Sequence, residues 1–294
     1  MLARLLRTIL LAQAGSGAVL GVWLYASGHT GLWAIPLLAL LTPLGILVLQ
    51  ASLHAYRARS NAPMRQQWQA WSGEIGAAVR LFVLRQPWSW QAPAFLPHRA
   101  AVPGIPVLLV HGFISNHRIW DRMLPQLRAH GHSVLAIDLE PLFCSIDDYA
   151  EAIEQAVQEL RQRSGAAQVA LLGHSMGGLA IRAWRRRYGS QQVARIITLG
   201  TPHQGTQARV AMPCTNGLQM AWHSAWLQDL NASETPDSLA LLRSAISAQD
   251  PIVFPQRAQG LPGVPLQMFE GIGHVQLCSA TKVLQWTLRE LALI

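Results

Sequence analysis

The stretch that does most to limit how this chain can fold covers residues 169–179 and reads Val-Ala-Leu-Leu-Gly-His-Ser-Met-Gly-Gly-Leu. A short apolar run typical of a buried strand leads into a G-x-S-x-G turn, and a helical pattern follows directly. Gly173 and Gly177 flank Ser175, so the backbone can reverse sharply without colliding with its neighbours. Such a turn leaves the serine strained and exposed at the end of the strand, where its hydroxyl can act as a nucleophile. A structural serine in a tight turn is the alternative, and the strand and helix around it favour the catalytic interpretation.

Residues 105–294 alternate short apolar runs with helical patterns, which indicates an α/β fold. Strands that alternate with helices form a parallel sheet with helices on both faces, and such strands are apolar along their whole length. The helical patterns cover residues 119–130, 146–163 and 179–188. The predicted strands are residues 106–110, 133–137, 168–172, 195–199 and 265–269, with a weaker sixth at 242–247.

A serine hydroxyl becomes a good nucleophile only when a base accepts its proton, so a histidine must reach Ser175. The chain has 11 histidines. His174 lies in the turn itself, where it cannot act on its own neighbour, and His203 lies in the middle of the domain. His274 lies on a glycine-rich loop between the last predicted strand and the final helix, which is where folds with the order serine, acid, histidine carry the base. We therefore predict His274 as the general base, with a histidine that only orients its loop as the alternative.

The third residue must hold the imidazole in the productive tautomer and balance its positive charge. Asp250 follows the weak sixth strand and precedes the last strand. Asp229 and Asp237 fall in a polar, irregular stretch. Glu270 is too close to His274 along the chain for easy pairing. We predict Asp250 as the acid, with the other three carboxylates as its rivals.

Attack on an ester carbonyl creates an oxyanion, which backbone amides stabilise when they point at it in advance. One amide should be that of Met176, the residue directly after the nucleophile, where the following helix begins. The second should come from the loop that leaves the first predicted strand, where Gly112 permits a close turn. Phe113 is the predicted donor, Ile114 is the neighbouring candidate, and a turn without this duty is the alternative.

Five sequence blocks occur in one order along residues 105–294: His111-Gly-Phe113, Gly173-His-Ser-Met-Gly-Gly178, Gly200-Thr-Pro-His-Gln-Gly205, Asp250-Pro-Ile-Val253 and Gly273-His274. In this order they resemble the α/β-hydrolase superfamily, particularly bacterial triacylglycerol lipases and related esterases. The resemblance implies an α/β-hydrolase fold, a triad of Ser175, Asp250 and His274, backbone oxyanion donors and carboxylic-ester substrates.

No metal site and no cofactor is expected. Lipases of the group that the chain resembles often carry an aspartate shortly after the catalytic histidine that helps to bind calcium, whereas residues 275–278 here read Val-Gln-Leu-Cys. The cysteines lie far apart without metal-site spacing, so buried free thiols are expected at Cys144, Cys214 and Cys278. The formal net charge is +8, but Lys282 is the single lysine and the arginines are scattered, so no nucleic-acid partner is expected.

Two uncharged runs near the N-terminus hold most of the excess hydrophobicity of a chain that is 51% hydrophobic and 13% charged. Residues 8–26 and 32–53 each offer the roughly 20 residues that a bilayer crossing requires. Residues 27–31 between them are rich in turn formers, so residues 1–60 are predicted to form a membrane hairpin. A signal peptide with a cleavage pattern at Ala12-Gln-Ala14 is the alternative for the first run.

Positive charges flank the two runs only on their outer sides. Arg4 and Arg7 precede the first run, and the second is followed by Arg57, Arg59 and Arg65. Because positively charged flanks stay in the cytoplasm, both ends of the hairpin are expected there. The domain that follows is therefore predicted on the cytoplasmic side of the inner or plasma membrane.

Residues 61–104 are expected to form an amphipathic segment and a proline-rich linker. The amphipathic stripe would lie on the membrane surface or pack against the domain, and it consists of Trp68, Trp71, Ile75, Val79 and Phe82. Residues 86–106 contain five prolines and are predicted to be extended. Residues 206–238 of the domain are a candidate lid, whose apolar side chains, Met212 among them, would line an acyl pocket or simply join the core.

These features predict a membrane-anchored serine ester hydrolase that acts on lipid-like or other hydrophobic esters. Ser175 would attack the ester to form an acyl-enzyme, and water activated by His274 would release the acid. An acyltransferase or thioesterase would use the same triad. The alternative from another class is a membrane-tethered scaffold on an inactive hydrolase fold, and the complete set of predicted catalytic residues argues against it.

Overall fold

The structure is a computed structural model, in which residues 1–58, 61–208 and 214–294 are described, so that Arg59 and Met212 lie outside the described residues. Seven strands form one sheet in the order β1-β3-β2-β4-β5-β6-β7. All neighbours pair in parallel except β1, which pairs antiparallel with β3 at the edge. The predicted α/β fold is confirmed, and each predicted strand is present. The strands are β1 Phe95–Leu96, β2 Val107–Val110, β3 Val134–Ile137, β4 Val169–His174, β5 Val193–Leu199, β6 Leu242–Ser247 and β7 Leu266–Phe269.

Helices cover both faces of this sheet. Strand β2 shows the division, because Leu108 and Val110 pack into one apolar cluster while Val107 and Leu109 pack into another. The first cluster includes helices α5 and α6, and the second includes α4 and α10. All residues of β2 are therefore buried, as expected for a central parallel strand. The four helices are α4 Met123–Ala129, α5 Ala150–Ser164, α6 Met176–Tyr188 and α10 Thr281–Ala292.

Two of the predicted helices begin with a 3₁₀ turn. The helix predicted at 119–130 is divided into η3, His117–Trp120, and α4. The helix predicted at 146–163 starts with η4, Ile146–Tyr149, and continues as α5. A capping box in which Ser145 and Asp148 exchange hydrogen bonds with each other's backbone satisfies the first amides of η4.

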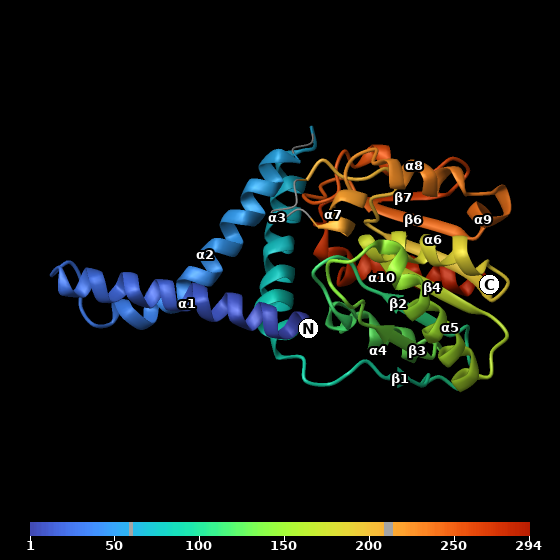
Figure 1. Cartoon of the computed structure of the whole chain (residues 1–294), viewed down its shortest axis with the longest axis horizontal. Coiled ribbons are helices and arrows are strands. Elements are labelled where there is room, and N and C mark those ends of the chain that lie inside the picture. The colour runs from blue at the N-terminus through green and yellow to red at the C-terminus, as the bar shows by residue number, and fades with distance from the viewer. Residues whose placement is uncertain (59–60, 209–213) are drawn as a thin grey trace.

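The N-terminal runs form two helices, α1 Leu2–Ala26 and α2 Ala34–Arg57, which pack against each other and project away from the sheet (Figure 1). Both helices are long and apolar enough to cross a membrane. Helix α1 begins before the predicted span 8–26, and α2 begins two residues into the predicted span 32–53 and ends four residues after it. Arg4, Arg7 and Arg57 therefore lie in helical turns rather than outside the helices.

Helix α3, Met64–Ala78, lies between the hairpin and the domain (Figure 1). It continues through the π-helical segment η1, Val79–Arg85, into the 3₁₀ turn η2, Gln86–Trp88. The buried face of α3 consists of Ala70, Glu74 and Ala78 rather than the predicted apolar stripe, whose Trp68 is 58% exposed. Phe82 of the stripe packs against the apolar clusters of the domain, while contact of the stripe with a membrane surface stays a prediction.

The segment predicted as an extended linker, residues 86–106, is in part integrated into the domain. Its strand β1 pairs Phe95 with Leu135 and Leu96 with Val134. Gln86 is fully buried, and its side-chain amide donates to Ser115 Oγ at 2.8 Å.

The candidate lid contributes side chains to the core. Met220, Leu227 and Leu230 are buried in the same cluster as α5 and α6. Trp226 Nε1 donates to Asp147 Oδ2 at 2.7 Å. Short helices occupy the described part of this segment and the region just after it: α7 Thr215–Gln219, α8 Ala225–Ala232 and α9 Pro236–Ala240.

Candidate active site

The predicted nucleophile turn joins β4 directly to α6. Ser175 separates the two elements and has φ 54° and ψ −127°, a strained conformation for a residue with a side chain. Its amide donates to the Leu199 carbonyl at the end of β5, at 2.8 Å. Helix α6 therefore begins at Met176, three residues before the start of the predicted helix.

Gly177, two residues after Ser175, is required for the close packing of α6 against β2. A Cβ on Gly177 would lie 2.2 Å from the carbonyl oxygen of Val110 in β2 and 2.5 Å from that of His111. Real Cβ atoms do not approach backbone oxygens so closely, so only glycine lets α6 start against the end of β2. The positive φ of this turn is thus at Ser175, while the missing side chain of Gly177 leaves room for the carbonyl oxygens of Val110 and His111.

His274 and Asp250 come together from two loops. Asp250 lies between β6 and β7, and His274 lies between β7 and the 3₁₀ turn η6, Val275–Cys278. His274 Nδ1 lies 2.6 Å from Asp250 Oδ2, and the two residues are 4% and 1% exposed. Asp250 Oδ1 accepts from the amides of Ile252 and Val253 at 2.8 and 2.7 Å. The Asp250 carboxylate thus accepts a hydrogen bond from Nδ1–H of His274, which leaves Nε2 as the proton-accepting nitrogen of the neutral ring.

Burial lowers the pKa of His274, but the charge and the hydrogen bond of Asp250 raise it, and the net shift is upward. A raised pKa strengthens the ring as a base and enlarges the pH range over which it is protonated. Catalysis by the neutral ring would therefore fall as the pH drops through the pKa of His274.

His174 connects the nucleophile turn to the loop of His274. Its Nε2 donates to the His274 carbonyl at 3.1 Å, and the two rings lie 4.6 Å apart, centroid to centroid. Burial and the nearby His274 hold the pKa of His174 well below its usual value, so this ring is neutral. Ser175 is 5% exposed, so the serine that was expected to be exposed is buried. It lies at the end of β4, on the edge of the parallel sheet where the loop of His274 follows β7. Among the described residues, its hydroxyl has no hydrogen-bond partner.

The rival residues lie elsewhere. Asp229, Asp237 and Glu270 are all exposed, and Glu270 bonds to Gln66 Nε2 at 2.7 Å. His203 is buried between Thr198 Oγ1, at 3.1 Å, and an arginine of α6.

A second histidine–carboxylate pair lies beyond β3. His117 Nδ1 is 3.0 Å from Asp138 Oδ1, and its Nε2 is 3.5 Å from Ser89 Oγ. Ser89 has ordinary backbone angles, φ −76° and ψ 104°, and follows η2 instead of preceding a helix. Ser89 thus lacks the strained turn and the helix start that distinguish Ser175.

The two predicted oxyanion donors lie beside Ser175. Met176 is the first residue of α6, whose first amides have no acceptor within the helix. Phe113 lies in the turn after β2, next to Ile114, which has φ 49°. A Cβ on Gly112 would lie 2.7 Å from Ser175 Cβ, so this turn lies directly against Ser175. The amides of Phe113 and Met176 donate to none of the described residues.

One residue at the site was not predicted. Glu74 of α3 is 6% exposed, and its carboxylate accepts from the amides of Val275 and Gln276, at 3.0 and 3.1 Å, directly after His274. Glu74 is the sole acidic residue in residues 1–120. A single carboxylate in such a long stretch was the feature of the sequence that could have marked it as a candidate site residue.

Over the described ranges, no group of three or more His, Cys, Asp or Glu residues could hold a metal ion. Cys144, Cys214 and Cys278 are free thiols, but only Cys278 is buried, so the expectation of burial was wrong for the partly exposed Cys144 and Cys214.

Residues 105–252 match a protein family described as alpha/beta hydrolase fold. The matched region contains Ser175 and Asp250 and ends before His274.

Triacylglycerol lipases are similar in sequence. The lipase of Pseudarthrobacter phenanthrenivorans is 30% identical over 181 residues, which cover 54% of this chain and 56% of the relative. The lipase of Burkholderia plantarii is also 30% identical over 181 residues, which cover 54% of this chain and 50% of the relative. The chain thus spans about half the length of the curated relatives it matches.

Solved lipase structures share the fold. The mature lipase BlEst2 of Bacillus licheniformis gives a TM-score of 0.57 at 18% identity and covers 69% of this chain and 98% of its own. Aspergillus fumigatus lipase B gives a TM-score of 0.53 at 17% identity, and the match covers 66% of this chain and 55% of the lipase.

Proposed function

Because the chain belongs to the alpha/beta hydrolase fold family, we propose that it is a membrane-anchored serine hydrolase that cleaves hydrophobic carboxylic esters. The observation that carries this proposal is the buried His274–Asp250 pair, at 2.6 Å, on the same edge of the sheet as the strained Ser175. The sequence similarity to triacylglycerol lipases supports an ester as the substrate class.

In the proposed mechanism, Ser175 Oγ attacks the ester carbonyl carbon while His274 Nε2 takes its proton. The contact between Ser175 Oγ and His274 Nε2 would form when substrate binds, because catalytic hydrogen bonds commonly tighten only in the substrate complex. Asp250 holds the ring and balances its charge, and the amides of Phe113 and Met176 stabilise the oxyanion. His274 then protonates the departing alcohol, which leaves Ser175 acylated. Water attacks the acyl-enzyme, gives its proton to His274, and the acid departs as Ser175 is reprotonated.

Membrane anchoring is supported by the hairpin itself. Gly17 and Gly21 lie at the α1–α2 contact, where a Cβ on Gly17 would be 2.3 Å from the Leu38 carbonyl oxygen. Small residues at such spacing allow helices to pack closely in lipid, where apolar burial does not drive association. The outward faces of both helices are apolar and exposed, as a lipid environment requires.

Both ends of the hairpin contact loops at the edge of the sheet that carries the site. Leu2 and Leu6 of α1 pack with Leu142, which follows β3. The carbonyl of Ala58, just after α2, accepts from Gln256 Nε2 at 3.2 Å, in the segment that follows Asp250. These contacts support a domain whose catalytic edge faces the bilayer and takes its ester substrates from there.

The acid assignment is tested by substitution. Asp250→Asn should lower the rate of ester hydrolysis by about 10²- to 10⁴-fold, because the amide cannot hold the productive tautomer or balance the imidazolium charge. Asp229→Asn and Glu270→Gln should stay within about twofold of the wild type, since both side chains are exposed. Hydrolysis of p-nitrophenyl esters of increasing acyl length, with purified protein in detergent, measures all three. A larger loss in either control would reassign the acid.

The topology is tested by fusions after Ile294. Arginines flank the apolar runs 8–26 and 32–53 only on their outer sides, so we expect both ends of the hairpin in the cytoplasm. A green fluorescent protein fusion should then fluoresce, and an alkaline phosphatase fusion should be inactive. The opposite pair of results would place the domain outside the membrane. That outcome would overturn the orientation and leave the chemistry standing.

A further inference from the structure

Helix α3 runs along the loop that carries His274. Gln66 Nε2 donates to Glu270 Oε2 at 2.7 Å near the start of this contact, and Glu74 accepts from Val275 and Gln276 further along. The helix that follows the membrane hairpin thus contacts the residues on both sides of the candidate general base.

Both oxygens of the Glu74 carboxylate are used in this contact. Oε1 accepts from the Val275 amide at 3.0 Å, and Oε2 accepts from the Gln276 amide at 3.1 Å. These are the first two amides of η6, which begins directly after His274. A buried carboxylate is costly unless hydrogen bonds compensate it, so the position of these two amides and the position of Glu74 depend on each other.

Two glycines make the close approach feasible. A Cβ on Gly273 would lie 2.3 Å from Glu74 Oε2, and a Cβ on Gly73 would lie 2.3 Å from Gln276 Oε1. The residue before His274 and the residue before Glu74 therefore both lack side chains at the point where helix and loop meet.

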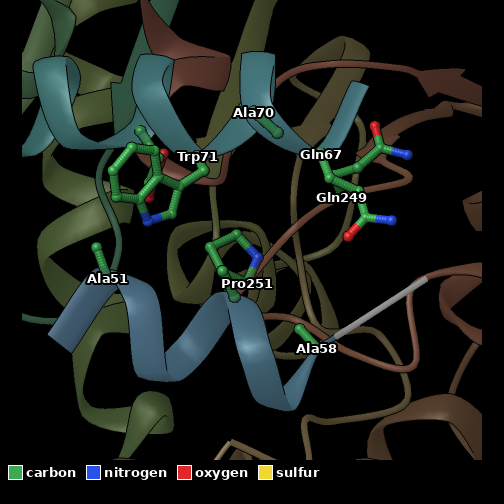
Figure 2. Close-up of a pocket in the computed structure, with 9 residues that line it drawn as sticks. Ala51, Ala58, Gln67, Ala70, Trp71, Gln249 and Pro251 are labelled. Carbon is green, nitrogen blue, oxygen red and sulfur yellow. The ribbon is translucent and has the colours of Figure 1, made fainter. Parts of the chain in front are cut away.

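The same helix also lines a cavity together with the neighbours of the candidate acid. Figure 2 shows a cavity between α2, α3 and the loop that carries Gln249 and Pro251, and Glu74 is one of its lining residues. Its volume of about 40 Å³ is far too small for an acyl chain, for which hundreds of Å³ are usual. Gln249 Oε1 accepts from the Gly271 amide at 2.6 Å, which joins the loop of Asp250 to the loop of His274.

The charge of Glu74 also acts on the imidazole of His274. Burial raises the pKa of Glu74 to about 7, against the opposing effects of His274 and the two amides. The titratable groups around His274 are Asp250, Glu74 and His174, and Glu74 also faces Cys278. When ionised, Glu74 adds to Asp250 in favouring the protonated ring and thereby raises the pKa of His274.

We propose that Glu74 is a positioning residue that fixes the His274 loop, so that α3 completes the active site. This inference rests on the proposed function, because it assigns His274 the role of general base. It makes the segment before residue 105 part of the catalytic unit as well as a connection to the anchor.

The test compares Glu74→Gln and Glu74→Asp with Gln66→Ala in the full chain. Glu74→Gln should lower kcat by about 10- to 100-fold with a small change in KM, because one amide loses its acceptor and the loop shifts. The acidic limb of the rate profile and the NMR titration of His274 should both move to lower pH. Glu74→Asp keeps the charge, so its limb should stay near that of the wild type while kcat falls. Gln66→Ala removes only an exposed contact of the same helix and should leave kcat within about twofold.

Unchanged kcat and an unchanged His274 titration in Glu74→Gln would overturn the proposal, as would an equal loss in Gln66→Ala. The titration does not depend on turnover. If the wild type hydrolysed no ester and took no fluorophosphonate label, the proposed function would fail, while a shifted titration in Glu74→Gln would still establish the coupling of Glu74 to His274.

Discussion

Replacing Ser175 with alanine is expected to lower ester hydrolysis by at least about a thousandfold while the protein remains folded. The substitution removes the attacking oxygen and the group that forms the acyl-enzyme, and loss of such a residue leaves only the contributions of the oxyanion hole and of binding. The Ser175 hydroxyl has no hydrogen-bond partner among the described residues, so its removal leaves no buried group unpaired. His274→Ala should be similarly damaging. Hydrolysis of a short-chain p-nitrophenyl ester and labelling with a fluorophosphonate measure the effect, and thermal unfolding checks the fold.

The matched control for this experiment is Ser89→Ala, because Ser89 is the other serine that lies near a histidine–carboxylate pair. It should retain labelling and activity within about twofold, since Ser89 lacks the strained turn of Ser175. Activity in Ser175→Ala above a tenth of the wild-type value would refute the nucleophile assignment. Loss of labelling in Ser89→Ala alone would move the nucleophile to Ser89.

The second large effect concerns stability. Glu234→Gln should destabilise the domain by about 3–5 kcal/mol and lower Tm by about 10 °C. Glu234 Oε1 accepts from Arg182 Nε at 2.8 Å, and Oε2 pairs with Arg185, so one carboxylate neutralises two buried guanidinium groups of α6. Arg182 is fully buried and also donates to Asn231 Oδ1 at 2.7 Å. The variant leaves both cations buried without a counter-charge.

The control for the stability effect is Glu159→Gln. Glu159 pairs with Arg163 at 2.9 Å on the surface, where both side chains are about half exposed. Such a pair contributes only about 0.5 kcal/mol. Denaturant or thermal unfolding in one detergent compares the two variants, and equal losses would show that burial of the Glu234 network adds nothing.

The sheet and much of the candidate site could be predicted because short segments of the sequence carry the patterns that specify them. Apolar runs of fully buried strands differ sharply from the helical patterns between them, and the G-x-S-x-G turn requires its glycines because β2 lies against the start of α6. Asp250 and His274 could be chosen because chain order and their place after strands limit the candidates. The structure joins these two side chains directly, while their catalytic roles remain to be tested.

The parts that were not predicted depend on contacts between distant segments. Strand β1 has two residues, too few to show periodicity. Glu74 is 201 positions from Val275, and no local pattern reports such a contact. The buried residues of α3 are Ala70, Glu74 and Ala78, and apolar periodicity could not identify them because a carboxylate is among them.

The attachment of both hairpin ends to the catalytic edge has a consequence for kinetics. In a membrane-anchored chain, the domain cannot turn this edge toward bulk water without breaking the contacts of Leu2, Leu6 and Ala58. Under the proposed function, a lipid ester would therefore reach the site by lateral diffusion in two dimensions. The rate should follow the mole fraction of ester in the bilayer rather than its amount per volume of suspension, so diluting the substrate with an inert phospholipid would slow the reaction even when the total ester is constant.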